Sequence, residues 1–400
     1  MKASHFLIAA VCFVAAVTSC KEKNLPFVSL EEADYVASAK ALLPSEGLVD
    51  TMSYLMGTQA GADVVYSFGS LDLSRVDKAV EDFKKISFKD FEAAAATNFA
   101  DSAAAAPLAA AFEIDPALLS ETYSKYMSAR QTDEEGVVAE VPATLVDSMS
   151  YLYGILTGYR VAGMKIEYPR FRKGLEDFIT FDTDSQYKNY MMTREATEEY
   201  TAYAAQYEIA PETIQEVGRA YQSAQNAAKM ENYKTQSKNF FEKAEKVKGF
   251  EVKSVTYNVN RTDSLATSKI LYRIDEKGAG EQVAFGDNFT VEYKGIHVDG
   301  STFDEGSFPV DGFSDGGLIK GFTEALLLLK DGGKMTVVIP FELGYGERGS
   351  QNWMTGEYSI YPYETLVFEL GVKDLVKPEP EAEEEVPAEE LPVNAELVAE

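Results

Sequence analysis

The stretch from Asn288 to Leu375 constrains the fold of this chain most. Apolar and polar side chains alternate along Phe289-Thr290-Val291-Glu292-Tyr293, which is the period of a half-buried strand. The dipeptide Asp299-Gly300 predicts a tight turn, and an apolar run from Leu318 to Lys330 predicts a short helix. Two further strands are expected at Met335–Ile339 and Thr365–Leu370. Antiparallel strands packed on one short helix predict an α+β module.

Six segments of this stretch resemble, in order, the sequence signature of the FKBP-type peptidyl-prolyl isomerases. They are Tyr293-Lys294-Gly295, Asp299-Gly300, Phe303-Asp304, Leu318-Ile319-Lys320-Gly321-Phe322, Tyr345-Gly346 and Thr365-Leu366-Val367-Phe368. Each segment alone is weak, but their order across one domain makes the resemblance specific. It implies an FKBP-like antiparallel half-barrel sheet wrapped on one short helix, at residues 258–377, with peptidyl-prolyl cis-trans isomerase activity.

The resemblance also implies the residues of a pocket for the proline ring. Its apolar and polar members would be Tyr293, Phe303, Asp304, Phe308, Leu318, Ile319, Phe322, Tyr345, Ile360 and Phe368. Phe322 would be the floor, Ile360 the rim, and the backbone N–H of Ile319 the donor to a substrate carbonyl. The sequence departs from the family at Phe322, where Trp is usual, and at Lys320, where Pro is usual. These departures favour, as the alternative, a non-catalytic holdase or binding module with a degraded isomerase pocket.

An internal repeat fills the region before this domain. The segment Leu48–Gly57 recurs almost unchanged as Leu145–Gly154, and Lys78–Phe83 is echoed by Lys173–Phe178. Each copy continues with a third helix after a proline that follows acidic residues. We expect helical repeat 1 at residues 47–131 and helical repeat 2 at 142–249, the latter including a long connecting helix.

The repeated unit is similar to the amino-terminal domain of the macrophage infectivity potentiator branch of the FKBP family. In that branch, the resemblance implies, two short helices from each of two chains interlock to form a dimer. Here both copies lie in one chain, and linked modules meet at high effective concentration. The sequence therefore predicts a monomeric pseudo-dimer, with a homodimer that exchanges repeats between chains as the alternative. Gly57 and Gly154 would each cost about 1 kcal/mol inside a helix, which close helix crossing would explain.

The two ends of the chain have their own signatures. Residues 1–19 resemble a lipoprotein signal peptide, in which a short apolar run leads to Cys20 as the site of lipid attachment. An ordinary secretory signal is the alternative. Residues 20–46 are expected to be a linker, and residues 378–400 a disordered acidic tail. This pattern predicts an outer-membrane lipoprotein of a Gram-negative bacterium, held to the membrane by its lipid and facing either the periplasm or the cell surface.

Composition narrows the chemistry that remains. A formal net charge of −28 argues against nucleic acid as a partner. The two histidines, His5 and His297, provide no catalytic triad or metal cluster, so we expect no metal and no cofactor. Prolyl isomerisation needs neither. The partners expected are proline-containing unfolded or exported polypeptides, with macrolide inhibitors as further ligands implied by the resemblance.

Overall fold

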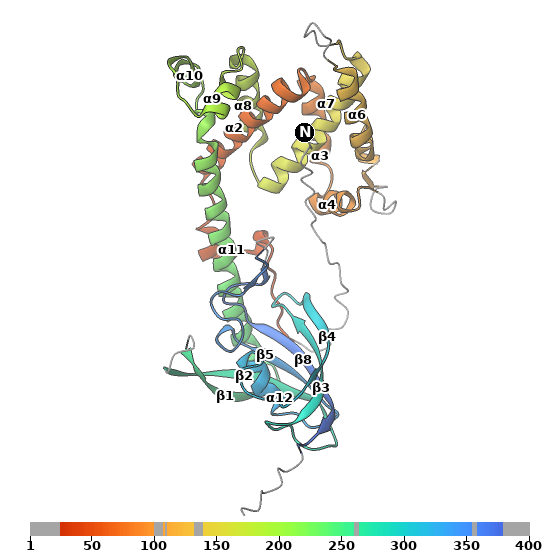
Figure 1. The fold of residues 1–400 in the computed structure, drawn as a ribbon, viewed down its shortest axis with the longest axis vertical. Helices are drawn as coiled ribbons and strands as arrows, with labels where there is room; N and C mark the ends of the chain where they lie inside the picture. The colour runs from red at the N-terminus through yellow and green to blue at the C-terminus, as the bar shows by residue number, and fades with distance from the viewer. Residues whose placement is uncertain are drawn as a thin grey trace, which may run out of the picture. The chain divides into compact units, whose positions relative to one another are not determined.

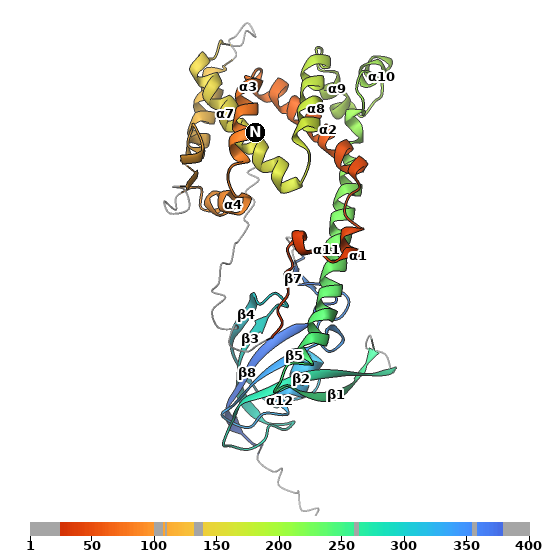
Figure 2. The same cartoon turned by 180° about the vertical axis from the view of Figure 1, so that it is seen from behind.

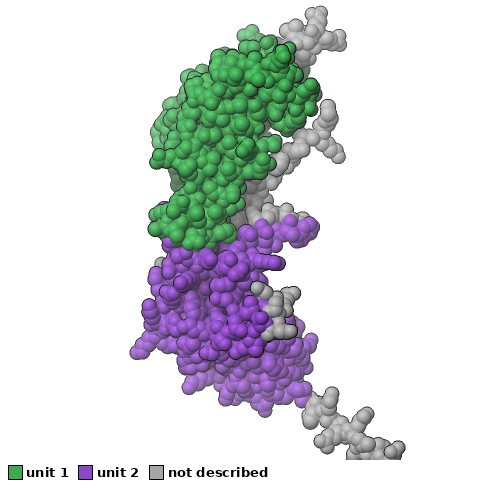
Figure 3. Space-filling view, turned by 90° about the vertical axis from the view of Figure 1, so that its left-hand side faces the viewer, with its two compact units in different colours: residues 1–15, 37–231 green, residues 16–36, 232–400 purple. Residues whose placement is uncertain are grey.

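The computed structural model describes residues 25–99, 107–108, 110–131, 139–259, 264–353 and 358–378. Cys20, the expected signal peptide and the tail from residue 379 lie outside them. Of the described residues, 37–231 form one compact unit, the helical unit, and 25–36 with 232–378 form a second, the sheet unit (Figure 3). No helix in the described ranges is both long and apolar enough to cross a membrane.

The helical unit consists of helices joined by short connections. Its elements are α1 (Ala37–Lys40), α2 (Glu46–Asp63), η3 (Val64–Phe68), α3 (Leu73–Phe83), α4 (Phe88–Ala96), η4 (Pro116–Leu118), α6 (Leu119–Ala129), α7 (Ala143–Met164), α8 (Tyr168–Phe181), α9 (Gln186–Thr193), α10 (Glu198–Ala204), η5 (Pro211–Thr213) and the first part of α11 (Ile214–Ala244). Ser45 and Asp72 accept backbone N–H groups at the starts of α2 and α3, as N-caps do.

The two copies of the repeat interlock inside the helical unit. Helix α2 of the first copy packs on α8 of the second, and α3 of the first packs on α7 of the second (Figures 1 and 2). Glycines allow these close crossings. A Cβ atom added at Gly57 would lie 1.9 Å from the carbonyl oxygen of Phe171, and one at Gly174 would lie 2.0 Å from that of Tyr54. Each copy of the repeat therefore packs closely against the other at these two crossings.

The polar contacts at these crossings occur twice. Tyr54 donates to Asp177 at 2.8 Å, and its counterpart Tyr151 donates to Asp82 at 2.7 Å. The arginines repeat as well: Arg170 pairs with Asp50 at 2.7 Å and Glu208 at 2.8 Å, while Arg75 pairs with Asp147 at 2.7 Å and Glu113 at 2.8 Å. Matching residues of the two repeated segments thus make matching polar contacts at the two crossings.

The sheet unit contains a six-stranded antiparallel sheet in the order β1-β2-β5-β8-β3-β4. The strands are β1 (Glu251–Asn258), β2 (Leu265–Lys277), β3 (Asn288–Ile296), β4 (Thr302–Val310), β5 (Gly333–Ile339) and β8 (Leu366–Val376), with β6 (Ser350–Gln351) and β7 (Tyr358–Ile360) forming a separate pair. The expected α+β class is confirmed. Strand β2 lies inside the sheet, because β1 pairs with it on one side and β5 on the other.

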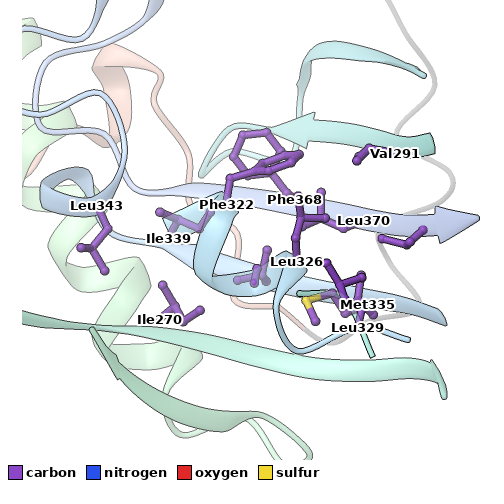
Figure 4. Close-up of a cluster of buried hydrophobic side chains, with 14 of the residues drawn as sticks. Ile270, Val291, Phe322, Leu326, Leu329, Met335, Ile339, Leu343, Phe368 and Leu370 are labelled. Atoms are coloured by element: carbon purple, nitrogen blue, oxygen red, sulfur yellow. The ribbon is translucent and has the colours of Figure 1, made fainter. Parts of the chain in front are cut away.

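One face of the sheet packs on the short helix α12 (Lys320–Leu326). Phe322 and Leu326 of α12 contact a buried core to which Ile270, Val291 and Met335 contribute (Figure 4). The helix is shorter than the apolar run from Leu318 to Lys330 suggested. Leu329 lies after the end of this helix, but it is 1% exposed and belongs to the same buried core.

The opposite face is covered by two segments from elsewhere in the chain. Leu25 and the end of α11, at Phe240 and Ala244, pack on strand residues that include Ile296 and Val367. Residues 25–36, here called the amino-terminal strap, also bond the sheet directly, because the N–H of Val28 donates to the carbonyl of Val298 at 2.9 Å. The stretch expected as a linker is therefore packed against the sheet at residues 25–36.

Candidate active site

A cavity of ≈ 930 Å³ opens beside α12 in the sheet unit. Nine of the ten residues expected at the proline site line it: Tyr293, Phe303, Asp304, Phe308, Leu318, Ile319, Phe322, Tyr345 and Phe368. The tenth, Ile360, does not line the cavity. It is 3% exposed and belongs to the buried core, so the structure does not place it at the rim.

The aromatic rings around the cavity hold one another in place. Phe322 and Phe368 meet edge to face with centroids 5.2 Å apart (Figure 4). Phe303 meets Phe368 in the same way at 5.7 Å. Tyr293 approaches Phe322 at 6.5 Å and Phe308 at 5.6 Å. Perpendicular arrangements are favoured by the ring quadrupoles. Together these five rings form an apolar aromatic cup.

Two glycines explain why the rings can sit so close to the strands. A Cβ atom at Gly295 of β3 would lie 2.4 Å from the ring of Phe303, so only glycine leaves room for that ring. A Cβ atom at Gly321, just before Phe322, would lie 2.4 Å from a methyl group of Ile339. The glycines of two of the sequence segments are thus required by the packing of the cup.

Asp304 and two tyrosines make the polar side of the cavity. The Tyr293 hydroxyl donates to Oδ2 of Asp304 at 2.8 Å, and this hydrogen bond raises the pKa of Tyr293. Burial raises the pKa of Tyr345, and the negative charge of Asp304 raises it further. Both phenols therefore stay protonated at neutral pH. The single hydrogen of Tyr293 is used by Asp304, so Tyr345 is the phenol that can donate a hydrogen bond into the cavity. The partner that Asp304 has within the described chain is the neutral hydroxyl of Tyr293.

The start of α12 is fixed by a salt-bridge cluster. Lys320 lies 2.7 Å from Asp315 and 3.1 Å from Glu324, and Glu324 also pairs with Lys253 at 2.8 Å. Ile319 is the N-cap residue, and its backbone N–H is among those for which a helix provides no internal acceptor. Lys320, which replaces the family's usual proline, therefore anchors the loop that presents this N–H.

Sequence reasoning missed one wall of the cavity. Thr256, Tyr257 and Asn258 of β1 line it, as do Asp315 and Glu342. The expected domain began at residue 258, so β1 fell outside it. The alternation of Val255 and Tyr257 with polar neighbours was the available signal, since this is the pattern of a half-buried strand. Within the described ranges no cluster of His, Cys, Asp and Glu could hold a metal ion.

An antiparallel sheet wrapped on one short helix, with an aromatic cup beside that helix, defines the class of FKBP-like domains. Residues 280–373 match the family described as FKBP-type peptidyl-prolyl cis-trans isomerase.

Among curated proteins, the chain is 32% identical over 196 residues to the FKBP-type peptidyl-prolyl cis-trans isomerase FkpA of Escherichia coli strain K12, covering 46% of this chain and 63% of the relative. It is 37% identical over 157 residues to a probable FKBP-type isomerase of Haemophilus influenzae, covering 38% and 58%. To the outer membrane protein MIP of Legionella longbeachae it is 34% identical over 112 residues, covering 28% and 46%. The chain thus spans less than two thirds of the length of each of these relatives.

A crystal structure of FkpA from Escherichia coli is also similar, with 26% sequence identity and a TM-score of 0.31. That match covers 52% of this chain and 93% of the FkpA chain.

Proposed function

We propose that this chain is a peptidyl-prolyl cis-trans isomerase that assists the folding of exported polypeptides. The observation that carries the proposal is the aromatic cup formed by Tyr293, Phe303, Phe308, Phe322 and Phe368, lying in a domain of the FKBP family. Binding of a proline ring in the cup needs neither a cofactor nor a nucleophilic side chain.

The proposed mechanism is preferential binding of the twisted amide. Rotation about an X-Pro bond is opposed by amide resonance, a barrier of about 18–20 kcal/mol. In the twisted form this resonance is lost, so the carbonyl is less polar and suits a dry aromatic wall better than either planar form does. Phe322, 5% exposed, and Phe368, 4% exposed, would supply that wall. The N–H of Ile319 and the hydroxyl of Tyr345 would hold neighbouring carbonyls of the peptide.

A protease-coupled assay with a proline-containing tetrapeptide tests this proposal. The mature chain should be used, with Cys20→Ser to avoid the lipid. A fragment of residues 258–377 would lack β1 and the strap. Asp304→Leu should lower kcat/KM by about tenfold or more, because it removes the partner of Tyr293 and a polar wall of the cup. Glu305→Leu is the matched control, since Glu305 is the exposed next residue of β4 and does not line the cavity. Equal loss in both variants, or none in either, would contradict the assigned site.

A non-catalytic binding module remains the second candidate, and Phe322 is the observation that favours it. Its ring is smaller than the usual Trp and offers no N–H group, so the cup could hold a proline without accelerating its rotation. Tight peptide binding with no turnover in the same assay would support this candidate over the first.

For the location, we propose attachment to the bacterial outer membrane through a lipid on Cys20. The apolar run before Cys20 and the similarity to a relative named outer membrane protein MIP support it. Cys20→Ser should release the processed protein from membranes, because no helix among the described residues could span a membrane in place of the lipid. Continued sedimentation of the processed variant with membranes would refute the lipid anchor.

For the assembly, we propose a monomeric pseudo-dimer. The pairing of α2 with α8 and of α3 with α7, with polar contacts duplicated at both crossings, supports it, because one chain supplies both halves of the interlocked unit. Sedimentation equilibrium of the Cys20→Ser mature chain should give the mass of one chain at micromolar concentration. A mass twice as large would instead indicate exchange of repeats between two chains.

A further inference from the structure

The cavity is larger than a proline ring requires, and its extra wall comes from outside the residues matched to the family. That match begins at residue 280, whereas Thr256, Tyr257 and Asn258 belong to β1. Glu342 of η7 (Phe341–Leu343) also lines the cavity. When a proline occupies the cup, the side chains that flank it in the substrate lie only one residue step, roughly 3.5 Å, away along the peptide. The wall near Tyr257 is therefore positioned to meet a flanking side chain.

Tyr257 offers a fixed aromatic surface at this wall. It is half-buried and packs against the core of the sheet unit, so its ring is held by β1. Burial raises the pKa of its phenol, and the negative charge of Glu342 raises that pKa further. Tyr257 and Glu342 both line this cavity, and the carboxylate is close enough to the phenol to oppose its ionisation.

The charge of the lining is predominantly negative. Its acids are Asp304, Asp315 and Glu342, and its single base among the described lining residues is Lys320. Lys320 is engaged by Asp315 at 2.7 Å and by Glu324 at 3.1 Å. Glu342 itself is exposed and forms no ion pair with any residue that the structure describes. A positively charged substrate group would therefore meet the Glu342 carboxylate, which forms no ion pair with a described lysine or arginine.

We propose that Tyr257 and Glu342 form a subsite that selects a lysine or arginine next to the substrate proline. The methylene groups of such a side chain would lie along the Tyr257 ring, as long basic side chains do on apolar surfaces. Its charged end would sit near the ring and pair with the Glu342 carboxylate. A glutamate in the same substrate position would be repelled. This inference rests on the proposed function, because it assumes that the cup holds the proline.

The test compares peptides that differ only in the residue before proline: lysine, leucine or glutamate. With the mature chain at low ionic strength, kcat/KM should be about three- to tenfold higher for lysine than for glutamate. High salt should reduce this ratio because the carboxylate is exposed. In Glu342→Gln the ratio should fall to about one, and in Tyr257→Leu it should fall partway. Glu347→Gln, an exposed acid five residues later that does not line the cavity, should keep the full ratio.

Calorimetric binding of the same peptides separates this inference from the proposed function. Turnover of the leucine peptide tests the isomerase alone. If it is absent, the binding ratio between the lysine and glutamate peptides still tests the subsite. Equal affinity for these two peptides, or a lysine preference that survives Glu342→Gln, would overturn the inference whether or not the protein turns peptides over.

Discussion

Replacing Gly57 by alanine tests whether the interlocked crossing of α2 and α8 holds the helical unit together. Within an isolated helix this change is favourable, by about 1 kcal/mol. In the folded unit the new methyl group would lie 1.9 Å from the carbonyl oxygen of Phe171 and 2.9 Å from the backbone nitrogen of Leu175. Carbon–oxygen contacts normally begin near roughly 3.3 Å. The obstacle is backbone, so the two helices must move apart by more than an ångström.

The expected cost follows from these opposing terms. Forcing an extra methyl group into a packed core costs about 1–3 kcal/mol. Separation of α2 from α8 would also strain the hydrogen bond of 2.8 Å between Tyr54 and Asp177. We expect the net effect of Gly57→Ala to be a destabilisation of about 2 kcal/mol, even after the helix-propensity gain. For a unit of this size that corresponds to a fall in Tm of about 4–8 °C.

Thermal and urea unfolding followed by far-ultraviolet circular dichroism would measure this cost, because the helical unit contributes most of the helical signal. Gly218→Ala is the matched control: it also lies within a helix, but the nearest atom to its added Cβ is 3.9 Å away, on the side chain of Met52. That variant should be unchanged or slightly more stable. If Gly57→Ala proved as stable as Gly218→Ala, the crossing would not be as close as described, and the interlock would lose its support.

Three further outcomes are expected. Burial alone would lower the pKa of His297, but its hydrogen bond of 2.7 Å to Glu364 raises that pKa overall. The sheet unit should therefore lose stability as pH rises through the raised pKa. An equally steep dependence of Tm on pH in His297→Gln would contradict this. Burial opposes ionisation of Asp82, yet hydrogen bonds from two lysines and Tyr151 hold its pKa well below the usual range. Asp82→Asn should therefore lower the free energy of unfolding of the helical unit by about 2 kcal/mol, because it weakens hydrogen bonds to a charged acceptor, and it should reduce the loss of stability in acid. An unchanged urea midpoint would contradict this. Phe27→Ala should destabilise the sheet unit by about 2 kcal/mol, because it removes a ring stacked on Phe240 at 5.7 Å. The expected result is faster thermal inactivation of isomerase turnover, with the circular dichroism of the helical unit unchanged.

Local patterns in the sequence predicted the fold class and most strands of the sheet. The alternation along Phe289–Tyr293 survives as part of β3, and the Asp299-Gly300 turn forms, with Gly300 at φ 89°. The end of α12 was not predictable in the same way. Leu329 is apolar because it fills the core, and an apolar residue gives the same signal whether the backbone there is helical or extended.

The residues of the candidate site also differ in whether local sequence patterns could predict them. Residues that belong to a motif, such as Tyr293 and Phe368, could be placed at the cavity from sequence order alone. Tyr257 could not, because its contribution depends on β1 pairing with β2, and β1 lies outside the residues matched to the family. Ile360 was expected at the rim from its place in the motif, yet it is buried in the core. Sequence order thus identified the cup, whereas only the fold identified what lies beside it.

The amino-terminal strap has a consequence for how this protein is made. The N–H of Val28 donates to the carbonyl of Val298, and Leu25 packs in a cluster with Val367. Residues near the start of the chain therefore need partners that come much later in the sequence. During synthesis the strap emerges well before the strand face that it covers. Contacts at such sequence separation slow folding, and both apolar surfaces stay uncovered until then. A protein proposed to help others fold would therefore itself depend on protection from aggregation until its synthesis is complete.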